Sequence, residues 1–200
     1  ARIHENVAVT AIARDGAGWR VATEGGAIRA GKIVNAAGPW AGHIGRMVGL
    51  DLPISGTVQQ VIATEPTGQV MRHLVAHAAR HLSLKQGDGG HLLVGGGWPG
   101  TADPQDGATR NARRSIEGNL WIAGRVVPAL EGLHAIRAWT GLNVQIDRAP
   151  VLGGSARVPG FFHTVTSNGM TLGPISGRMT AEAVLGREAV PPSFSPDRFG

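Results

Sequence analysis

The sequence contains no cysteine and few aromatic residues, which make up 4% of its 200 positions. The absence of cysteine excludes disulfides, thiolate catalysis, cysteine-ligated metals and a flavin tethered to a cysteine of this segment. It is compatible with the reducing cytoplasm, where we expect the protein to reside. A nucleic-acid surface needs a basic stripe with interleaved aromatics. The net charge of +5 is spread along the chain instead, so we expect no nucleic-acid partner.

Long apolar runs are also missing. None approaches the roughly 18 to 20 residues that a membrane-spanning helix requires, so we expect no membrane span. A hydrophobic share of 42% with 16% charged residues is typical of a folded globular chain rather than a disordered one. Because the sequence opens on Ala1 without a Met, we interpret it as a fragment of a longer protein, and the lack of a targeting signal carries little weight.

The hydrophobic pattern predicts a mixed α/β fold. Short β-branched runs bounded by Gly, Asp and Pro predict strands, and apolar residues spaced three or four apart predict helices. Strands are expected at 7–12, 19–23, 27–35, 58–64, 82–85, 92–94, 135–142 and 161–166, and helices at 40–48, 109–127 and 171–185. Regular structure is expected to end at Pro191-Pro192.

Two segments far apart in the chain share one pattern. Residues 33–41 (IVNAAGPWA) and 167–174 (SNGMTLGP) each follow a strand, contain small residues and lead into a predicted helix. Such junctions let a backbone approach a flat, anionic cofactor closely. Taken alone, each pattern is weak, since an Asn-Gly pair is most often a turn.

The order of these segments carries a family resemblance. They flank the run 137–142 (RAWTGL), which is followed by Asp147, Pro150 and Gly153, and the chain closes on 194–199 (FSPDRF). In this order the motifs resemble the second half of an FAD-dependent oxidoreductase of the D-amino-acid oxidase, glycine oxidase and sarcosine oxidase type. The resemblance implies an incomplete Rossmann-like FAD-binding domain, made of 1–49 and 143–200, split around a mixed β-sheet substrate domain at 50–142.

The resemblance also implies which residues contact FAD. Backbone N–H groups at the start of the last helix would stabilise negative charge near N1 and the C2 carbonyl of a reduced flavin. Gly169 would stand where a Cβ would strike the ring. The alternative is a plain strand-to-helix turn. The cofactor-binding residues implied are Val7, Ala36, Ala37, Gly38, Asn168, Gly169, Met170, Thr171 and Leu172.

The activity implied is oxidation of an amine or amino acid to an imine by hydride transfer to flavin, with no catalytic acid or base identified. Members of the glycine oxidase type carry basic residues where this sequence has Asn143 and Ser167. Either another residue, such as Arg137 or Arg148, holds the substrate carboxylate, or the substrate is not a simple α-amino acid. Arg137 could equally be a buried structural residue. The substrate-binding candidates are therefore Asn143, Ser167 and Arg137.

The first half of the resembled family, with its dinucleotide fingerprint, is expected to be missing, with no Gly-x-Gly-x-x-Gly after a predicted strand. Gly95-Gly96-Gly97 follows a predicted strand, but no Lys-Ser/Thr and no nearby helix come after it, so a strand exit is favoured over a phosphate loop. We therefore expect this chain alone to bind FAD weakly or not at all and to be inactive as a fragment. The alternative is a non-catalytic substrate-domain or subunit-interaction module, which would work with a partner subunit or electron acceptor.

Histidines suggest a second kind of site. His73, His77 and His81 recur every four residues, which on a helix resembles metal-ligand spacing. No Asp or Glu stands nearby, so a polar surface segment is favoured and no metal is expected. His163 lies in the strand before the second junction. There we expect a partly buried, hydrogen-bonded structural histidine rather than a catalytic one.

Overall fold

The computed structural model describes residues 1–103 and 108–200 and divides into two compact units. Unit 1 comprises 1–56 and 144–200, and unit 2 comprises 57–143. The mixed α/β class expected from the sequence is confirmed. The assignment of 1–49, 50–142 and 143–200 to cofactor and substrate domains stays a prediction.

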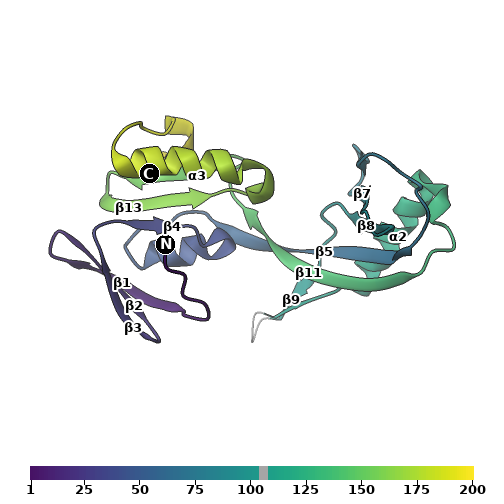
Figure 1. Cartoon of the computed structure of the whole chain (residues 1–200), viewed down its shortest axis with the longest axis horizontal. Coiled ribbons are helices and arrows are strands. Elements are labelled where there is room, and N and C mark those ends of the chain that lie inside the picture. Colours follow the sequence, from purple (N-terminus) through teal and green to yellow (C-terminus); the bar gives the residue numbers. More distant parts are fainter. Residues whose placement is uncertain (104–107) are drawn as a thin grey trace. The chain divides into compact units, whose positions relative to one another are not determined.

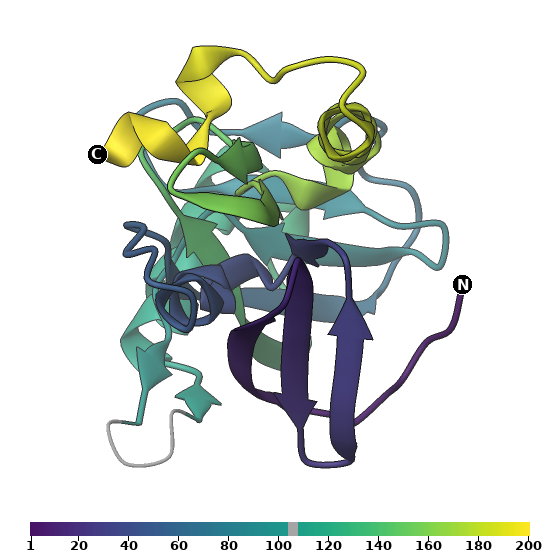
Figure 2. The same cartoon turned by 90° about the vertical axis from the view of Figure 1, so that its left-hand side faces the viewer.

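Unit 1 begins with an antiparallel meander (Figure 2). Strand β1 (Val9–Asp15) pairs with β2 (Gly18–Thr23), which pairs with β3 (Gly26–Ala30). Gly16 forms the first turn with a φ of +58°, a value that glycine adopts without a Cβ clash. The meander predicted from the sequence is confirmed.

A second, mixed sheet of unit 1 has the strand order β12-β13-β4. Strand β13 (Val158–Val165) runs antiparallel to β12 (Val151–Ser155) and parallel to β4 (Ile33–Asn35). Helix α3 (Gly169–Leu185) packs on β12 and β13, as Figure 1 shows. The 3-10 turn η1 (Gly38–Trp40) and helix α1 (Ala41–Arg46) follow β4. The buried core of this unit comprises Ile12, Trp19, Ala41, Leu50, Leu52, Ile54, Val151, Phe161 and Val165.

Unit 2 is built on a five-stranded sheet in the order β11-β5-β8-β7-β6. These strands are β5 (Ser55–Pro66), β6 (Val75–Ala76), β7 (Ser83–Gln86), β8 (His91–Gly95) and β11 (Ala135–Gln145). The predicted hairpin of β7 and β8 is confirmed. A short ladder of β9 (Thr101–Ala102) and β10 (Thr109–Arg110) precedes helix α2 (Arg113–Val126) and the 3-10 turn η2 (Pro128–Leu130).

Helix α2 covers one face of this sheet. Strand side chains alternate between faces, and the buried ones, such as Ile62, Leu84, Leu92 and Val94, form a cluster with Ile122 of α2. The side opposite α2 carries the intervening residues. We call that side the open face.

Two segments differ from the sequence expectation. The helix expected from Thr109 begins at Arg113, because Thr109–Arg110 pairs with β9 and the Gln60 side chain accepts the Ala112 N–H at 3.0 Å. Regular structure also continues beyond Pro191-Pro192, as the 3-10 turns η3 (Pro192–Phe194) and η4 (Pro196–Phe199). Proline fixes φ near the helical value, so it starts such turns readily.

A string of glycines follows β8. Gly95, Gly97 and Gly100 do have the spacing Gly-x-Gly-x-x-Gly behind a strand, a match the sequence expectation overlooked. Strand β9 follows it rather than a helix, so it lacks the strand–turn–helix context of a dinucleotide site. Gly96, with a φ of +116°, passes so close to Leu82 that an added Cβ would lie 2.5 Å from its backbone. Gly96 therefore serves close packing at a strand exit.

Two glycine substitutions test the packing of unit 1. A Cβ on Gly42 would lie 2.5 Å from the backbone oxygen of Ile54, so Gly42→Ala should destabilise the protein by about 1–3 kcal/mol. Gly177 of α3 has no heavy atom within 4 Å of an added Cβ among the described residues. Gly177→Ala should stabilise it by up to about 1 kcal/mol through helix propensity. Urea unfolding followed by circular dichroism measures both, and equal effects would contradict the packing described.

Candidate functional site

The two junctions singled out in the sequence lie at the same edge of one sheet. Strands β4 and β13 are parallel neighbours, with Phe161 opposite Ile33 and His163 opposite Asn35. Residues 36–38 therefore leave the carboxyl end of β4 beside 166–172, which leave the carboxyl end of β13. Ligands of open α/β sheets bind outside such carboxyl ends.

Asn35 shapes the first junction. Its side chain is buried, accepts the Ala37 N–H at Oδ1 over 3.2 Å and donates from Nδ2 to the Ala41 carbonyl over 2.9 Å. These bonds tie the end of β4 to the start of α1 across the Ala36–Gly38 turn. Gly38 has a φ of +54°, where a side chain would be strained. The turn is thus held rigidly with small side chains along it.

The second junction presents an open helix start. Residues 167–171 are exposed, and Met170 reaches 98% of its free accessibility. Asn168 accepts the N–H groups of Thr171 and Leu172 through its carbonyl, but no side chain caps α3 and its first turn carries no acidic residue. The first N–H groups of a helix have no intrahelical partner and carry partial positive charge. The start of α3 can therefore receive an anionic or electron-rich group.

Gly169 is not required by packing within the chain. A Cβ added there would meet no heavy atom within 4 Å among the described residues, and its φ lies outside the left-handed region. An alanine at this position would therefore fit the protein itself. A bound group close to the first position of α3 would supply a reason for glycine there.

Val7 lies outside the strand in which the sequence placed it. Pairing of β1 begins at Val9, opposite Thr23, and Val7 is part of the preceding irregular segment with 37% of its surface exposed. Its expected backbone contact with a cofactor stays a prediction.

His163 is wholly buried behind the two junctions. Its ring packs edge-on against Phe161 with centroids 5.2 Å apart, and Asn35 Nδ2 donates to Nδ1 over 3.4 Å. Its Nε2 has no hydrogen-bond partner in the described part of the chain. Burial lowers the pKa of His163 to about 4. The expectation of a partly buried, fully bonded histidine is wrong, because the apolar core leaves one ring nitrogen unsatisfied.

Unit 2 gathers two of the three predicted substrate residues on one strand face. Arg137, Trp139 and Asn143 occupy alternate positions of β11 and share one side of it. The intervening Ala138 packs instead against the buried cluster, so this shared side is the open face. Arg137 is exposed and its guanidinium lies 5.6 Å from the Trp139 ring centroid. The alternative of a buried structural arginine is therefore wrong.

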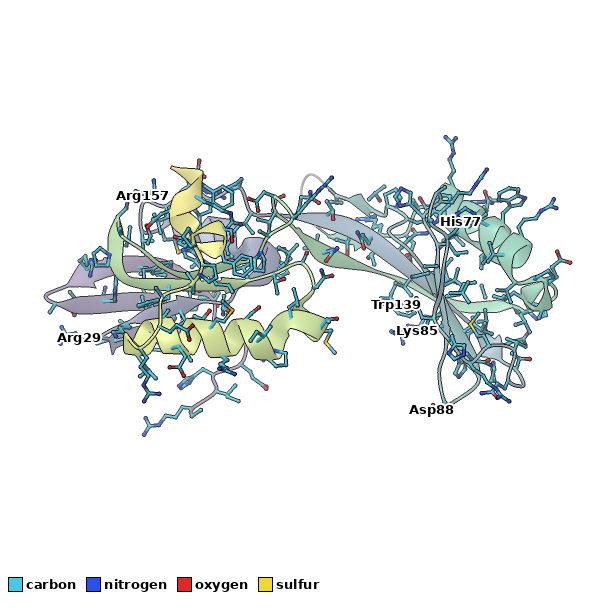
Figure 3. The ribbon with its side chains drawn as sticks, turned by 90° about the horizontal axis from the view of Figure 1, so that it is seen from above. Arg29, His77, Lys85, Asp88, Trp139 and Arg157 are labelled. Carbon is cyan, nitrogen blue, oxygen red and sulfur yellow. The ribbon has the colours of Figure 1, made fainter. Side chains whose placement is uncertain are left out.

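The open face is hollowed. A cavity of about 690 Å³ lies over it, and its lining includes Gln59, Val61, Ser83, Lys85, Leu93 and Trp139. Figure 3 labels Lys85 and Trp139, which extend from β7 and β11 into this region. The sequence analysis did not single out Lys85. Its place next to Leu84, in a strand with one apolar side, could have indicated that it points away from the core.

The remaining basic and polar candidates lie in unit 1. Ser167 is exposed beside Asn168 in the second junction. Arg148 is exposed with a φ of +82°, in a turn fixed by a fork of Arg198. Arg198 donates to the two oxygens of Asp147 over 2.8 and 2.9 Å, and this hydrogen bonding holds the pKa of Asp147 below its usual value.

The three spaced histidines do not share a helix face. Strand β6 pairs with β7, and a turn follows in which the His77 ring accepts the Ala79 N–H at 3.1 Å. The pairing of β6 with β7 takes the place of the helix that the histidine spacing would require. Within residues 1–103 and 108–200, no group of three or more His, Asp or Glu side chains is arranged to hold a metal ion. The same residues contain no helix long and apolar enough to cross a membrane.

Known proteins match most of the chain. A family described as FAD dependent oxidoreductase matches residues 1–183. Glycine oxidase from Pseudomonas aeruginosa is 30% identical over 208 residues, which cover 97% of this chain and 53% of that protein. One of the subunits of opine oxidase from Agrobacterium tumefaciens is 29% identical over 155 residues, covering 76% of this chain and 39% of that protein. The chain spans about half the length of the curated glycine oxidases it matches.

Solved structures agree with these matches. The crystal structure of glycine oxidase from Geobacillus kaustophilus has a TM-score of 0.85 and 26% identity, covering 96% of this chain and 52% of that one. L-proline dehydrogenase from P. horikoshii has a TM-score of 0.86 at 22% identity, covering 98% of this chain and 54% of that one, and so shares the fold.

The buried histidine predicts a dependence of stability on pH. The folded-state pKa of about 4 lies below the ordinary 6.5, so the unfolded chain takes up the proton first as the pH falls. Stability is therefore retained above about pH 6.5 and lost between about pH 6.5 and 4. The loss attributable to His163 between about pH 7.5 and 5 should be about 2 kcal/mol.

Chemical unfolding at several pH values measures this loss. His163→Asn keeps an acceptor near the position of Nδ1 and removes the titration, so the variant should lack this component of the acid loss. An unchanged pH slope in the variant would refute the assignment.

Proposed function

This chain belongs to the family of FAD-dependent oxidoreductases, and from that premise we propose that it takes part in oxidising an amine or amino acid to an imine. One observation carries the proposal. The Ala36–Gly38 turn and the start of α3 come together at the carboxyl edge of the β4–β13 pair, where a flat anionic group can be received. The glycine oxidases among the relatives support an amino acid as substrate.

The residues present fit FAD. At the start of α3 the N–H groups of Gly169 and Met170 precede the first backbone hydrogen bonds, and Gly169 leaves free space above it. Opposite them, Ala36, Ala37 and Gly38 keep side-chain bulk low. We assign cofactor contacts to Ala36–Gly38 and to 168–172, and Val7 as a further contact. Bound FAD would supply the acceptor for a hydride from the substrate carbon next to nitrogen.

Substrate binding is assigned to the predicted residues. Arg137, exposed on the open face of unit 2, can grip a carboxylate through two parallel N–H donors. Asn143, on the same side of β11, can donate and accept hydrogen bonds. In unit 1 the exposed Ser167 hydroxyl can bond a polar substrate group. No side chain is assigned as general acid or base.

A second candidate function is a module that works within a multi-subunit assembly. It is favoured by relatives whose names mark them as subunits, including the opine oxidase protein and the beta subunit of sarcosine oxidase from Rhizobium meliloti. In that case the chain would contribute binding surface to a larger complex. The two candidates differ in whether the protein itself holds flavin.

Flavin binding and reduction separate the candidates. We would purify the 200-residue chain and the complete product of its gene and record visible absorbance. Anaerobic bleaching of bound flavin by a panel of amines and amino acids would follow. Bleaching by an amine supports the oxidoreductase, whereas a complete product that takes up no FAD would overturn it in favour of the module. The 200-residue chain should bind FAD weakly, because it offers no strand–turn–helix fingerprint for the pyrophosphate.

A single glycine tests the flavin assignment. Gly169→Ala should leave the unfolding free energy unchanged or slightly raised, since its Cβ meets nothing in the protein. The same Cβ would strike a bound ring system and should weaken FAD binding at least about tenfold, a cost of about 1.4 kcal/mol. The matched control is Gly177→Ala in the same helix. The apoprotein of the complete gene product is titrated with FAD, and binding is followed by flavin fluorescence. Equal affinities of Gly169→Ala and Gly177→Ala would contradict the assignment.

A further inference from the structure

The open face of unit 2 carries two cations on opposite sides of a mostly apolar floor. Lys85 of β7 pairs across the ladder with Leu93 of β8, which in turn pairs with Ala63 of β5. Strand β11 is the next neighbour of β5 and contributes Arg137 and Trp139. Because β7 and β11 are three strand spacings of about 4.8 Å apart, the backbones that bear the two cations lie roughly 14 Å apart.

Hydrogen bonds at both ends fix the direction of β11 against β5. Glu65 N–H donates to the His134 carbonyl over 2.8 Å, and the Thr57 hydroxyl donates to the Asn143 carbonyl over 3.4 Å. The two strands are therefore antiparallel, and Arg137 lies beside the Val61–Ala63 stretch of β5. Both cations therefore flank the same apolar stretch of the sheet, formed by Ala63 and Leu93.

Neither cation is neutralised within the described residues. No ion pair there includes Lys85 or Arg137. Glu65 stands at the end of the same face, but its carboxylate is bonded to His134 Nδ1 at 2.8 Å. That bonding, with the His134 backbone N–H first, holds the pKa of Glu65 low. Lys85 lines the cavity of about 690 Å³ together with Trp139 and Leu93. Lys85 is exposed, so its ammonium is accessible to a ligand anion.

We propose that Lys85 determines substrate specificity by binding a second carboxylate, so that the substrate is an amine bearing two carboxylates. The inference rests on the proposed function and deepens it. Arg137 receives one carboxylate through its fork, and the Lys85 ammonium receives the other as a compact point charge. Arg137 and Lys85 then neutralise both carboxylates, and basic residues are not needed at Asn143 and Ser167.

Matched ligand pairs test this by binding alone, with FAD removed from the complete gene product so that no ligand is oxidised. Glutamate and glutamine have nearly the same shape and differ in one carboxylate, and iminodiacetate with its monoamide forms a second pair. Calorimetric titration of the 200-residue chain and of the complete gene product gives the dissociation constants. In at least one pair the dicarboxylate should bind about tenfold tighter than its amide.

Variants test whether the Lys85 charge distinguishes the dicarboxylate from its amide. Lys85→Met should remove the preference by weakening the dicarboxylate about tenfold while leaving the amide unchanged, and Lys85→Arg should restore most of it. Lys32→Met lowers the net charge equally, but it lies in unit 1 and should leave both constants unchanged. No preference in either protein, or an equal loss for both members of a pair in Lys85→Met, would overturn the proposal.

The two proposals fail in different ways. Flavin that bleaches with amines regardless of their charge would leave the oxidoreductase standing and remove the role of Lys85. Charge-selective binding that Lys85→Met abolishes, in a complete product that never takes up FAD, would retain Lys85 and remove the oxidoreductase.

Discussion

The parallel pairing of β4 with β13 is the contact on which the candidate cofactor site depends. Only the residue pairs from Ile33–Phe161 to Asn35–His163 make this ladder, yet they join segments from opposite ends of the chain. The buried Asn35–His163 link lies at its end, where β4 stops and β13 continues to Val165. The Nε2 of His163 has no hydrogen-bond partner within the described residues, so the packing around this link outweighs the cost of leaving that nitrogen unsatisfied.

In unit 2 the corresponding constraint is that helix α2 covers one side of the five-stranded sheet. Helix α2 packs on the buried side of the sheet, and Trp98 seats against Gly118, where an added Cβ would lie 2.5 Å from the indole. That close approach lets helix α2 pack near the strands. The other side of the same strands is left for polar, aromatic and charged groups, and the proposed substrate chemistry concerns that side.

Much of the fold follows from local pattern, and the site follows only in part. Alternation and turn residues predicted the meander, the β7–β8 hairpin and helix α3, because these are short-range structures. The start of α2 was mispredicted, because pairing of Thr109–Arg110 with β9 decided it. The two junctions were recognised from order and resemblance. The face of Arg137, the burial of His163 and the position of Lys85 needed the register of the sheet, which sequence pattern leaves open.

The division of labour between the two sides of the unit 2 sheet has an evolutionary consequence. Even-numbered positions such as Ile62, Leu84, Leu92 and Val94 build the core, whereas odd-numbered neighbours such as Val61, Lys85, Leu93 and Trp139 line the hollow. A change at an odd-numbered position alters what the surface recognises while leaving the packing under α2 intact. Single substitutions at the odd-numbered positions can therefore change ligand preference without changing the core residues that fold unit 2.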